Sequence, residues 1–284
     1  MSMNLQKNSG PVQLEYGSMN KNIEAYCKLL SISSVSESYE TMALDATKTK
    51  ISYQEYLYKL LQQQIIDRVD RSVNSKIKKA GFPYIAKLEE FDFSFQPKID
   101  EKLLRELSTL NFLDKAHNIV FVGPPGVGKT HLAIALGLEA TKQRRRVIFI
   151  TAEELTNELV AAKQSNTLTD YLEKISKIDL LIIDEIGYLD IQKDSASLFF
   201  QLISKRYEKS SIIITSNKPF EEWGDIFHDD IVASAILDRL LHHSYPFLIQ
   251  GKSYRMKNLM GDKNKNNNKS IEGGKNNRET DENL

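Results

Sequence analysis

One stretch, residues 118–131, constrains the fold of this chain more than any other. It starts with an apolar run, residues 119–122, which is typical of a buried parallel strand. Residues 123–130 then match the phosphate-loop pattern G-x-x-x-x-G-K-S/T at each defined position, and residues 131–140 have the apolar spacing of a helix. A strand, a glycine-rich loop and a helix in this order predict a site for the phosphates of a nucleoside triphosphate.

The residue types in this loop suit phosphate binding. Glycines let the backbone curl, so that successive N–H groups point at phosphate oxygens. Lys129 would reach the β- and γ-phosphates, and the Thr130 hydroxyl would complete the coordination of Mg²⁺. The expected cofactors are therefore ATP and Mg²⁺. The residues that we expect to contact the nucleotide are Gly123, Pro124, Pro125, Gly126, Val127, Gly128, Lys129, Thr130, His131 and Asp184.

Two acidic residues, Asp184 and Glu185, end a second apolar run. An acid at the carboxyl end of a strand, facing the phosphate loop, is where Mg²⁺ bound to a triphosphate needs an oxygen ligand. We therefore expect Asp184 to hold the metal together with Thr130. Glu185 would orient or deprotonate the attacking water. This pair favours hydrolysis over phosphate transfer to a small acceptor.

Apolar runs alternate with helical patterns through the rest of the chain. The predicted strands after the loop are 146–151, 179–185, 211–216 and 245–250, and the predicted helices are 99–110, 153–163, 168–175, 195–209 and 230–242. This alternation predicts an α/β fold, a parallel five-stranded sheet with helices on both faces. At the end of the fourth strand Asn217 would lie beside the same crevice and bond the γ-phosphate or its water.

The domain boundaries follow changes in composition. Residues 1–18 are polar and predict a flexible lead, and residues 19–80 have the periodicity of a small all-helical N-terminal domain. Residues 81–98 form an aromatic connector whose alternation predicts an extended segment, and residues 99–260 form the ATPase domain. Residues 261–284 are rich in Asn, Lys, Gly and Glu without an apolar period, which predicts a disordered tail.

Net charge gives no general attraction to nucleic acid, because 38 Lys and Arg balance 38 Asp and Glu. A DNA site must therefore be local, and the candidates from this charge run are Arg144, Arg145 and Arg146. The arginine run also lies at a predicted helix end, where cations complement the helix dipole without any partner. The basic end of the helical pattern at 52–79 has the same two interpretations.

The remaining features exclude several classes of protein. The single cysteine, Cys27, forms no internal disulfide and agrees with a reducing cytosol. The N-terminus lacks the apolar core of a signal peptide, and no apolar run approaches membrane-spanning length. We expect a cytoplasmic protein with no membrane partner. His131, His242 and His243 have no metal-ligand spacing, and we interpret them as ordinary packing or surface histidines.

From about residue 80 to 257 the sequence resembles the IstB-like ATP-binding proteins of insertion sequences, which resemble DnaC- and DnaA-type AAA+ ATPases. The runs that carry the resemblance are 123–137, 180–188, 206–208, 215–217, 222–223, 237–242 and 251–255. Residues 20–80 resemble the helical N-terminal domain of this family more loosely.

The resemblance implies an AAA+ ATPase that self-assembles on target duplex DNA, with little sequence preference, and recruits and stimulates a cognate transposase. It implies a homo-oligomer with nucleotide between subunits, in which a neighbour donates an arginine. The family pattern puts this arginine at Arg239, with Arg206 as a rival, and puts a second sensor, acting within the same chain, at Arg255. The resemblance also places Lys163 where this branch of proteins is expected to contact DNA. The expected catalytic residues are thus Glu185, Lys129, Asn217, Arg239 and Arg255.

Three alternatives remain open. A DnaC-like replicative helicase loader would share the same motifs and differ in the partner of its N-terminal segment. A P-loop kinase for a small metabolite would transfer phosphate to that metabolite rather than to water. A scaffold protein whose DNA binding does not depend on nucleotide would bind duplex DNA equally well with and without ATP.

Overall fold

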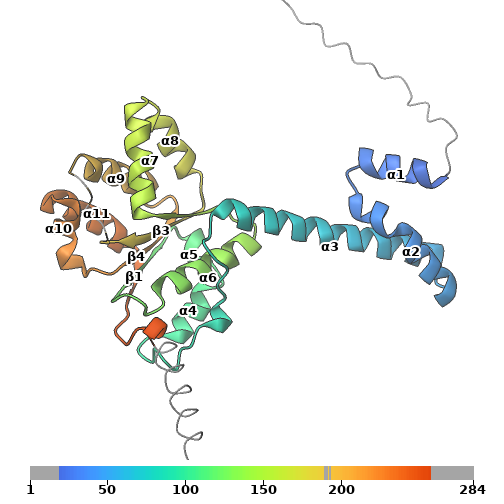
Figure 1. Ribbon diagram of the computed structural model, residues 1–284, viewed down its shortest axis with the longest axis horizontal. Helices are drawn as coiled ribbons and strands as arrows, with labels where there is room; N and C mark the ends of the chain where they lie inside the picture. The colour runs from blue at the N-terminus through green and yellow to red at the C-terminus, as the bar shows by residue number, and fades with distance from the viewer. Residues whose placement is uncertain (1–18, 189–190, 192, 257–284) are drawn as a thin grey trace, which may run out of the picture. The chain divides into compact units, whose positions relative to one another are not determined.

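The computed structural model describes residues 19–188, 191 and 193–256 (Figure 1). The lead predicted at 1–18 and the tail predicted at 261–284 lie outside these residues. The chain divides into two compact units between Asn74 and Ser75, inside helix α3 (Tyr53–Ala80). The sequence pattern had placed this boundary after residue 80, so the last turns of α3 belong to the second unit. No helix in the described ranges is both long enough and apolar enough to cross a bilayer.

The first unit consists of α1 (Met19–Leu29), α2 (Ser33–Thr49) and most of α3. Its small apolar core is formed by Cys27, Val35 and Leu60, with partly buried neighbours around them. The buried Gln64 accepts a hydrogen bond from the N–H of Ser34 (3.0 Å), which satisfies a donor in the first turn of α2.

The second unit contains a parallel five-stranded sheet, as predicted. Its strands are β1 (Asn118–Val122), β2 (Val147–Thr151), β3 (Leu180–Ile186), β4 (Ser211–Ser216) and β5 (Ser244–Leu248), in the spatial order β2-β3-β4-β1-β5. Because β4 lies between β3 and β1 and the three strands run in the same direction, their carboxyl ends meet at one edge of the sheet. The phosphate loop follows β1, the two acids lie near the carboxyl end of β3, just before Ile186, and Asn217 follows β4.

Helices cover both faces of the sheet (Figure 1). They are α4 (Glu101–Leu107), α5 (Asn111–Asp114), α6 (Lys129–Lys142), α7 (Ala152–Gln164), α8 (Leu168–Ser176), α9 (Lys193–Arg206), α10 (Trp223–Phe227) and α11 (Asp230–His242), with 3₁₀ turns η1 (Leu88–Glu90) and η2 (Phe220–Glu222). Alternate strand residues enter different cores, as the period of a strand requires. In β1, Ile119 and Phe121 pack with α6, whereas Val120 and Val122 pack with α9 and α11.

Residues 81–98 do not form the extended segment that their alternation predicted. They run through turns and η1, and Phe82, Phe91 and Phe93 pack against the core that contains α6. The aromatic residues enter one core from successive turns. Such a segment can show the same alternating sequence as a strand, so the alternation alone does not distinguish the two structures. The helix predicted at 99–110 is also shorter, because α4 ends at Leu107 and Leu110 has a left-handed φ of 70°.

Candidate functional site

The phosphate loop joins β1 to α6 and requires glycine at two positions. Gly126 and Gly128 have left-handed φ values of 80° and 99°. A Cβ atom at Gly126 would lie 2.1 Å from Oγ of Ser253, and one at Gly128 would lie 2.5 Å from Cε2 of Phe91. Two distant segments therefore hold the loop in place, one before β1 and one after β5.

Lys129 is the first residue of α6 and its side chain is buried. Its Nζ donates hydrogen bonds to the carbonyl oxygens of Gly123 (2.7 Å) and Pro124 (2.9 Å). Burial lowers the pKa of the Lys129 amine, and the Asp184 carboxylate opposes this shift. The ammonium group thus lies against the loop, beside the cavity that the loop encloses.

Asp184 and Thr130 lie in direct contact, as their predicted shared role requires. The Thr130 hydroxyl lies 2.9 Å and 3.1 Å from the two carboxylate oxygens of Asp184. Thr215 of β4 donates a third hydrogen bond to the same carboxylate. Burial raises the pKa of Asp184, and the hydrogen bonds from Thr215 and Thr130 oppose this. This oxygen-rich pair beside the loop has the donor chemistry that Mg²⁺ prefers.

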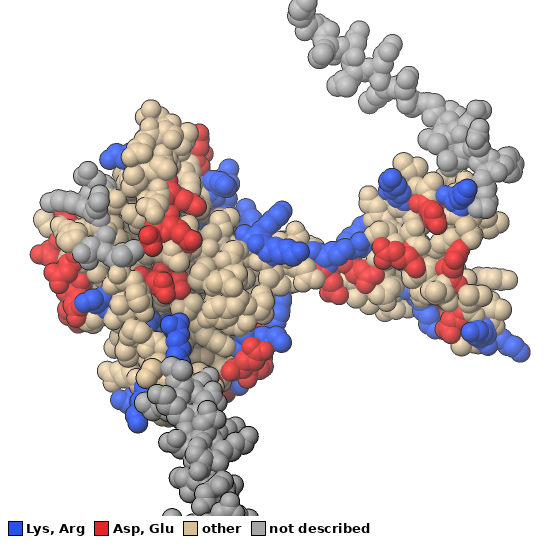
Figure 2. All heavy atoms as spheres, in the orientation of Figure 1, with Lys and Arg blue, Asp and Glu red and all other residues tan. Residues whose placement is uncertain are grey.

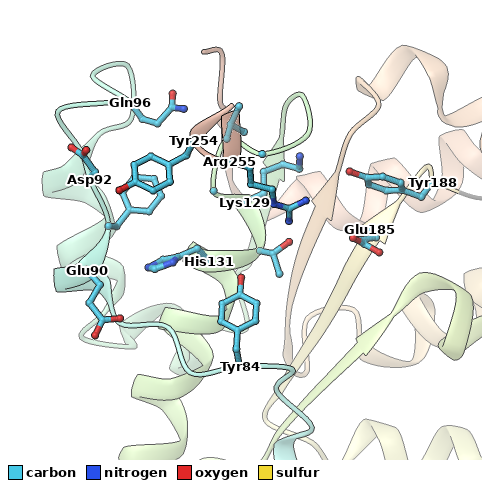
Figure 3. A pocket seen from close by; sticks show the side chains of 15 residues that line it. Tyr84, Glu90, Asp92, Gln96, Lys129, His131, Glu185, Tyr188, Tyr254 and Arg255 are labelled. Atoms are coloured by element: carbon cyan, nitrogen blue, oxygen red, sulfur yellow. The ribbon is translucent and has the colours of Figure 1, made fainter. Parts of the chain in front are cut away.

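Glu185 occupies a β-bulge in β3. Its φ of 65° is left-handed, and the pairing of β3 with β4 shifts between Ile183 and Ile186. Its N–H donates to the hydroxyl of Thr215 (3.0 Å), so Thr215 positions both acids. A non-glycine residue in this conformation is strained by about 1–3 kcal/mol, and such strain concentrates at functional sites. The bulge turns the Glu185 carboxylate away from the sheet and into the lining of the cavity (Figure 3).

The cavity has two further walls, which sequence patterns did not assign to the site. The segment before α4 contributes Tyr84, Glu90, Phe91, Asp92 and Gln96, and the chain beyond β3 contributes Tyr188. Figure 3 shows Glu185 and Tyr188 on one side of the cavity and Glu90, Asp92 and Gln96 on the other. The cluster of aromatic residues at 81–98 was the signal for this wall, but it was interpreted as a connector.

His131 also lines the cavity, and its ring contacts the segment that precedes α4. Nε2 lies 2.9 Å from the carbonyl oxygen of Lys87, and the ring lies 5.6 Å from that of Phe91 between centroids.

The segment after β5 brings Arg255 to the cavity. The N–H of Tyr254 donates to the carbonyl of Gly126 (2.9 Å), and the amide of the buried Gln96 donates to the carbonyl of Lys252 (3.1 Å). Tyr254 and Arg255 both line the cavity, where the Arg255 guanidinium lies near Lys129 (Figure 3). The structure therefore brings together Lys129, the two acids and Arg255. Lys129 and Arg255, the first and last of these residues, are 126 positions apart in the sequence.

Asn217 lies behind the acids rather than in the lining. A Cβ atom at Gly187 would lie 2.7 Å from Oδ1 of Asn217, which places the amide against the turn that follows Glu185. This Oδ1 is buried and, among the described residues, has no hydrogen-bond partner. The Asn217 amide thus packs against the turn that follows Glu185 and does not line the cavity.

Arg239 lies on α11, outside the cavity of its own chain. Its Nη1 donates to the carbonyl of Ala235 (3.1 Å), and its guanidinium lies 4.6 Å from the centre of the Phe200 ring. Arg239 is partly exposed at the molecular surface.

The rival residue Arg206 cannot contact a neighbouring subunit. Its side chain is fully buried and donates to the carbonyls of Ile175 (2.6 Å) and Ser211 (2.8 Å). Burial lowers the pKa of this arginine to about 10. It joins α8 to β4 inside the core, so the hypothesis that it acts in trans was wrong.

Two of the three clustered arginines are paired with acids. Arg145 forms an ion pair with Asp114, and Arg146 contacts Asp179 through both its backbone N–H (2.7 Å) and its guanidinium (3.0 Å). Arg144 is exposed, and its carbonyl accepts a hydrogen bond from Lys76.

Exposed cations also occur away from Arg144, Arg145 and Arg146. Lys163 is exposed on α7. Figure 2 shows Lys and Arg side chains gathered along the C-terminal half of α3. That half contains Arg68, Arg71, Lys76, Lys78 and Lys79.

Comparisons with known proteins agree with this geometry. Residues 25–261 match the sequence model of a protein family that is described as "IstB-like ATP binding protein". The chain is 47% identical to the insertion sequence IS21 putative ATP-binding protein of Pseudomonas aeruginosa over 235 residues. This matched region covers 83% of this chain and 89% of that protein.

Solved structures share the fold. AMPPCP-bound DnaA from Aquifex aeolicus superposes with a TM-score of 0.50 and 23% identity over 61% of this chain and 51% of that one. The DnaC helicase loader has the same TM-score, with 22% identity over 58% of this chain and 96% of that one. The fold of the second unit therefore resembles the AAA+ domains of DnaA and DnaC, and the chain belongs to the IstB-like ATP-binding proteins of insertion sequences.

Proposed function

We propose that this protein hydrolyses ATP at the cavity beside α6, and that the nucleotide state controls its assembly on duplex DNA in support of a transposase. The observation that carries the hydrolytic part is the position of Glu185. The bulge in β3 puts this carboxylate in the cavity lining, one residue after the Asp184 carboxylate that contacts Thr130. A carboxylate there can accept a proton from water as the water attacks the γ-phosphate.

The other residues of the cavity have complementary roles in this proposal. Lys129 exchanges its bonds with the loop carbonyls for bonds with phosphate oxygens, where a cation neutralises developing charge. Thr130 and Asp184 supply oxygen ligands for Mg²⁺, which would supply charge neutralisation at the phosphates. Arg255 reaches the phosphates from the segment that packs on Gly126, and Asn217 transmits the state of the Glu185 turn.

In this proposal, assembly completes the site with a residue from a neighbouring copy. The position of Arg239, outside its own cavity and partly exposed, supports such a role. The insertion-sequence context of the relatives supports a transposase as the protein partner. DNA phosphates would contact exposed cations, of which Arg144, Lys163 and the basic half of α3 are the best candidates, because Arg145 and Arg146 are occupied by acids. ATP and DNA are both available in the cytoplasm, where we place the protein.

The experiment that tests this function follows binding to a random-sequence duplex together with particle size, in ATP, in ADP and without nucleotide. We expect large particles on DNA only with ATP. Binding that is equal in the three states would support the nucleotide-independent scaffold. A monomer that ignores DNA in every state would contradict the proposal, and assembly on a replicative helicase instead of DNA would favour the helicase loader. Phosphate appearing on a metabolite rather than in solution would favour the kinase.

Mixing two inactive variants tests the role of Arg239 in trans. Arg239→Ala should bind ATP normally and lose hydrolysis by on the order of 1,000-fold, the usual effect of removing an arginine finger. Glu185→Gln should also be inactive, yet it retains Arg239. A mixture should regain ATPase activity, because a Glu185→Gln subunit can donate Arg239 to a neighbour whose Glu185 is intact.

Lys205→Ala, which removes an exposed cation from the end of α9, is the matched control and should keep full activity without mixing. A mixture that stays inactive, although the two variants co-assemble, would exclude Arg239 as the donated residue.

A further inference from the structure

A cluster of two histidines and one glutamate lies in the second unit, outside the nucleotide cavity. We propose that Glu208, His242 and His243 bind a divalent transition-metal ion, with Zn²⁺ as the best match to their donor set. Imidazole nitrogens and a carboxylate oxygen are the ligands of many Zn²⁺ sites with an open coordination position. This site was not foreseen from sequence, because Glu208 lies 34 positions before the first histidine.

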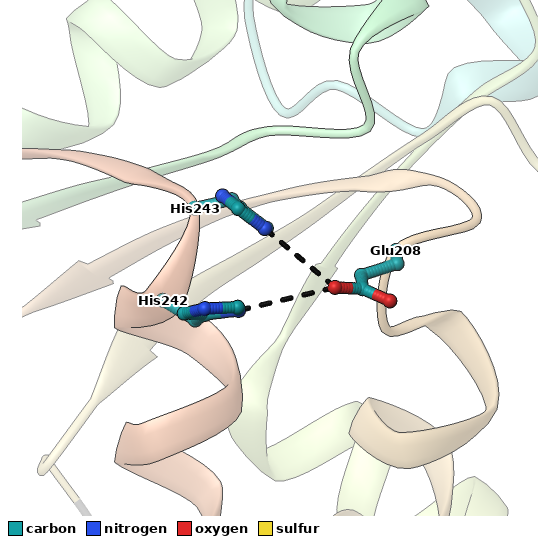
Figure 4. Close-up of side chains that lie close together, drawn as sticks. All are labelled: Glu208, His242 and His243. Carbon is teal, nitrogen blue, oxygen red and sulfur yellow. Dashed lines mark ion pairs between the residues drawn. The ribbon is translucent and has the colours of Figure 1, made fainter.

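The donor atoms already converge (Figure 4). Nδ1 of His242 lies 3.9 Å and Nε2 of His243 lies 3.6 Å from the same Oε1 of Glu208. One ligand atom from each residue lies within 4.8 Å of the other two. Around a tetrahedral Zn²⁺ with bonds of about 2.0–2.1 Å, ligand atoms are separated by about 3.3 Å. Metal binding would require the three exposed side chains to rotate toward one another.

The backbone that carries these ligands is held by buried hydrogen bonds. Asn118 donates from its amide to the carbonyl of Leu240 (3.1 Å), accepts from the N–H of Ile212 (2.9 Å), and donates its own N–H to the carbonyl of His243 (2.8 Å). The end of α11 is therefore fixed to β4, whose preceding turn carries Glu208. A preorganised scaffold of this kind reduces the ordering cost of metal binding.

The turn at Glu208 is itself constrained. Glu208, in the α9–β4 turn, has a left-handed φ of 56°, and its side chain is exposed. The buried Arg206 anchors both sides of this turn, since its carbonyl accepts from the N–H of Ser210 (3.1 Å) and its guanidinium donates to the carbonyl of Ser211 (2.8 Å).

A double ion pair, between Glu208 and two protonated histidines, explains the arrangement less well. The rings of His242 and His243 have centroids 4.0 Å apart, so two imidazolium cations would repel each other there. Neutral imidazoles instead offer lone pairs, which a metal ion can share with the carboxylate. The hydroxyl of Tyr207 lies 2.7 Å from Nδ1 of His242, and a metal ion would have to displace this contact. The exposure of all three ligands and this competition predict moderate affinity.

The proposed ion would join the α9–β4 turn to the last turn of α11, the helix that carries Arg239 three residues before His242. This inference does not depend on the proposed function, because it concerns ligands at a separate place in the second unit.

Metal titration of the full chain, without nucleotide, tests the site. We expect Co²⁺ to bind at one equivalent with a visible absorption band, and Zn²⁺ to displace it. At a Zn²⁺ concentration about 100-fold above the Kd, the Tm should rise by roughly 5–10 °C. His243→Ala and Glu208→Gln should each weaken Co²⁺ binding by about tenfold or more.

Two control variants separate this cluster from other ligands. His228→Ala removes the exposed histidine that follows α10, and Asp184→Asn removes the predicted Mg²⁺ ligand; both should bind Co²⁺ like the unmodified protein. Circular dichroism establishes that each variant is folded. The absence of saturable binding in the folded unmodified protein would overturn the proposal. Unchanged affinity in His243→Ala and Glu208→Gln would also overturn it.

Discussion

Replacing Lys129 with alanine is expected to abolish ATP-dependent assembly on DNA. The ammonium group lies at the start of α6 against the loop carbonyls, where charge-assisted hydrogen bonds to phosphate would replace its present contacts. Losing one or two such bonds should weaken ATP binding by at least about tenfold, and the rate of hydrolysis should fall by on the order of 100-fold or more. Calorimetric ATP binding, phosphate release and particle size on duplex DNA measure these three effects.

Lys142→Ala is the matched control. Lys142 is the last residue of the same helix, is exposed, and forms an ion pair with Glu139. This variant should bind ATP, hydrolyse it and assemble like the unmodified protein. Lys129→Ala could instead assemble on DNA at the ATP concentration that the unmodified protein requires. DNA binding would then not depend on the phosphate loop, and the proposed control of assembly by ATP would be contradicted.

Much of the second unit was predictable because its signals are local. The strand, loop and helix around Lys129 follow one another in sequence, and each apolar run is long enough to identify a buried strand. The alternation of strands and helices then determined a parallel sheet, which places the ends of β1, β3 and β4 at one edge. Thr130 and Asp184 come into contact because β4 alone separates β1 from β3, a strand order that the alternation does not predict.

The walls of the cavity were not predictable because they depend on contacts between distant segments. Phe91 packs against Gly128, and Gln96 bonds to the carbonyl of Lys252. Neither contact leaves a periodic pattern in the sequence. The same limit applies to Thr215, since a threonine at a strand end gives no sign that its hydroxyl will bond both Asp184 and the N–H of Glu185.

Charged residues were the hardest to interpret from sequence, because a cation's role depends on its partner. Arg206 lies in a run that resembles the family pattern, but it is buried and donates to backbone carbonyls. Arg145 and Arg146 belong to a basic run, yet Asp114 and Asp179 neutralise them. Asp114 and Asp179 lie 31 and 33 positions away from their partners, so the pairing appears only in three dimensions.

Glu185→Gln should separate ATP binding from ATP hydrolysis. Glutamine keeps the size of the side chain and can occupy the same bulge, but it cannot accept a proton from water. ATP affinity should therefore stay within about twofold, whereas hydrolysis should fall by roughly 100- to 10,000-fold. The DNA assembly formed with ATP should persist longer, because the hydrolytic step that would release it is blocked. Single-turnover phosphate release and the dissociation rate of preformed DNA particles measure the two effects.

Glu221→Gln provides the comparison, since Glu221 is an exposed glutamate on η2 that does not line the cavity. It should match the unmodified protein in both measurements. Rapid dissociation of the Glu185→Gln assembly, with hydrolysis absent, would mean that release does not wait for hydrolysis. The strained backbone at Glu185 makes the alternative outcome informative as well: if glutamine relaxed the bulge, the hydrogen bond from its N–H to Thr215 would be lost and ATP affinity would fall together with hydrolysis. Retained affinity with lost hydrolysis is thus the result that assigns the chemistry to the carboxylate itself.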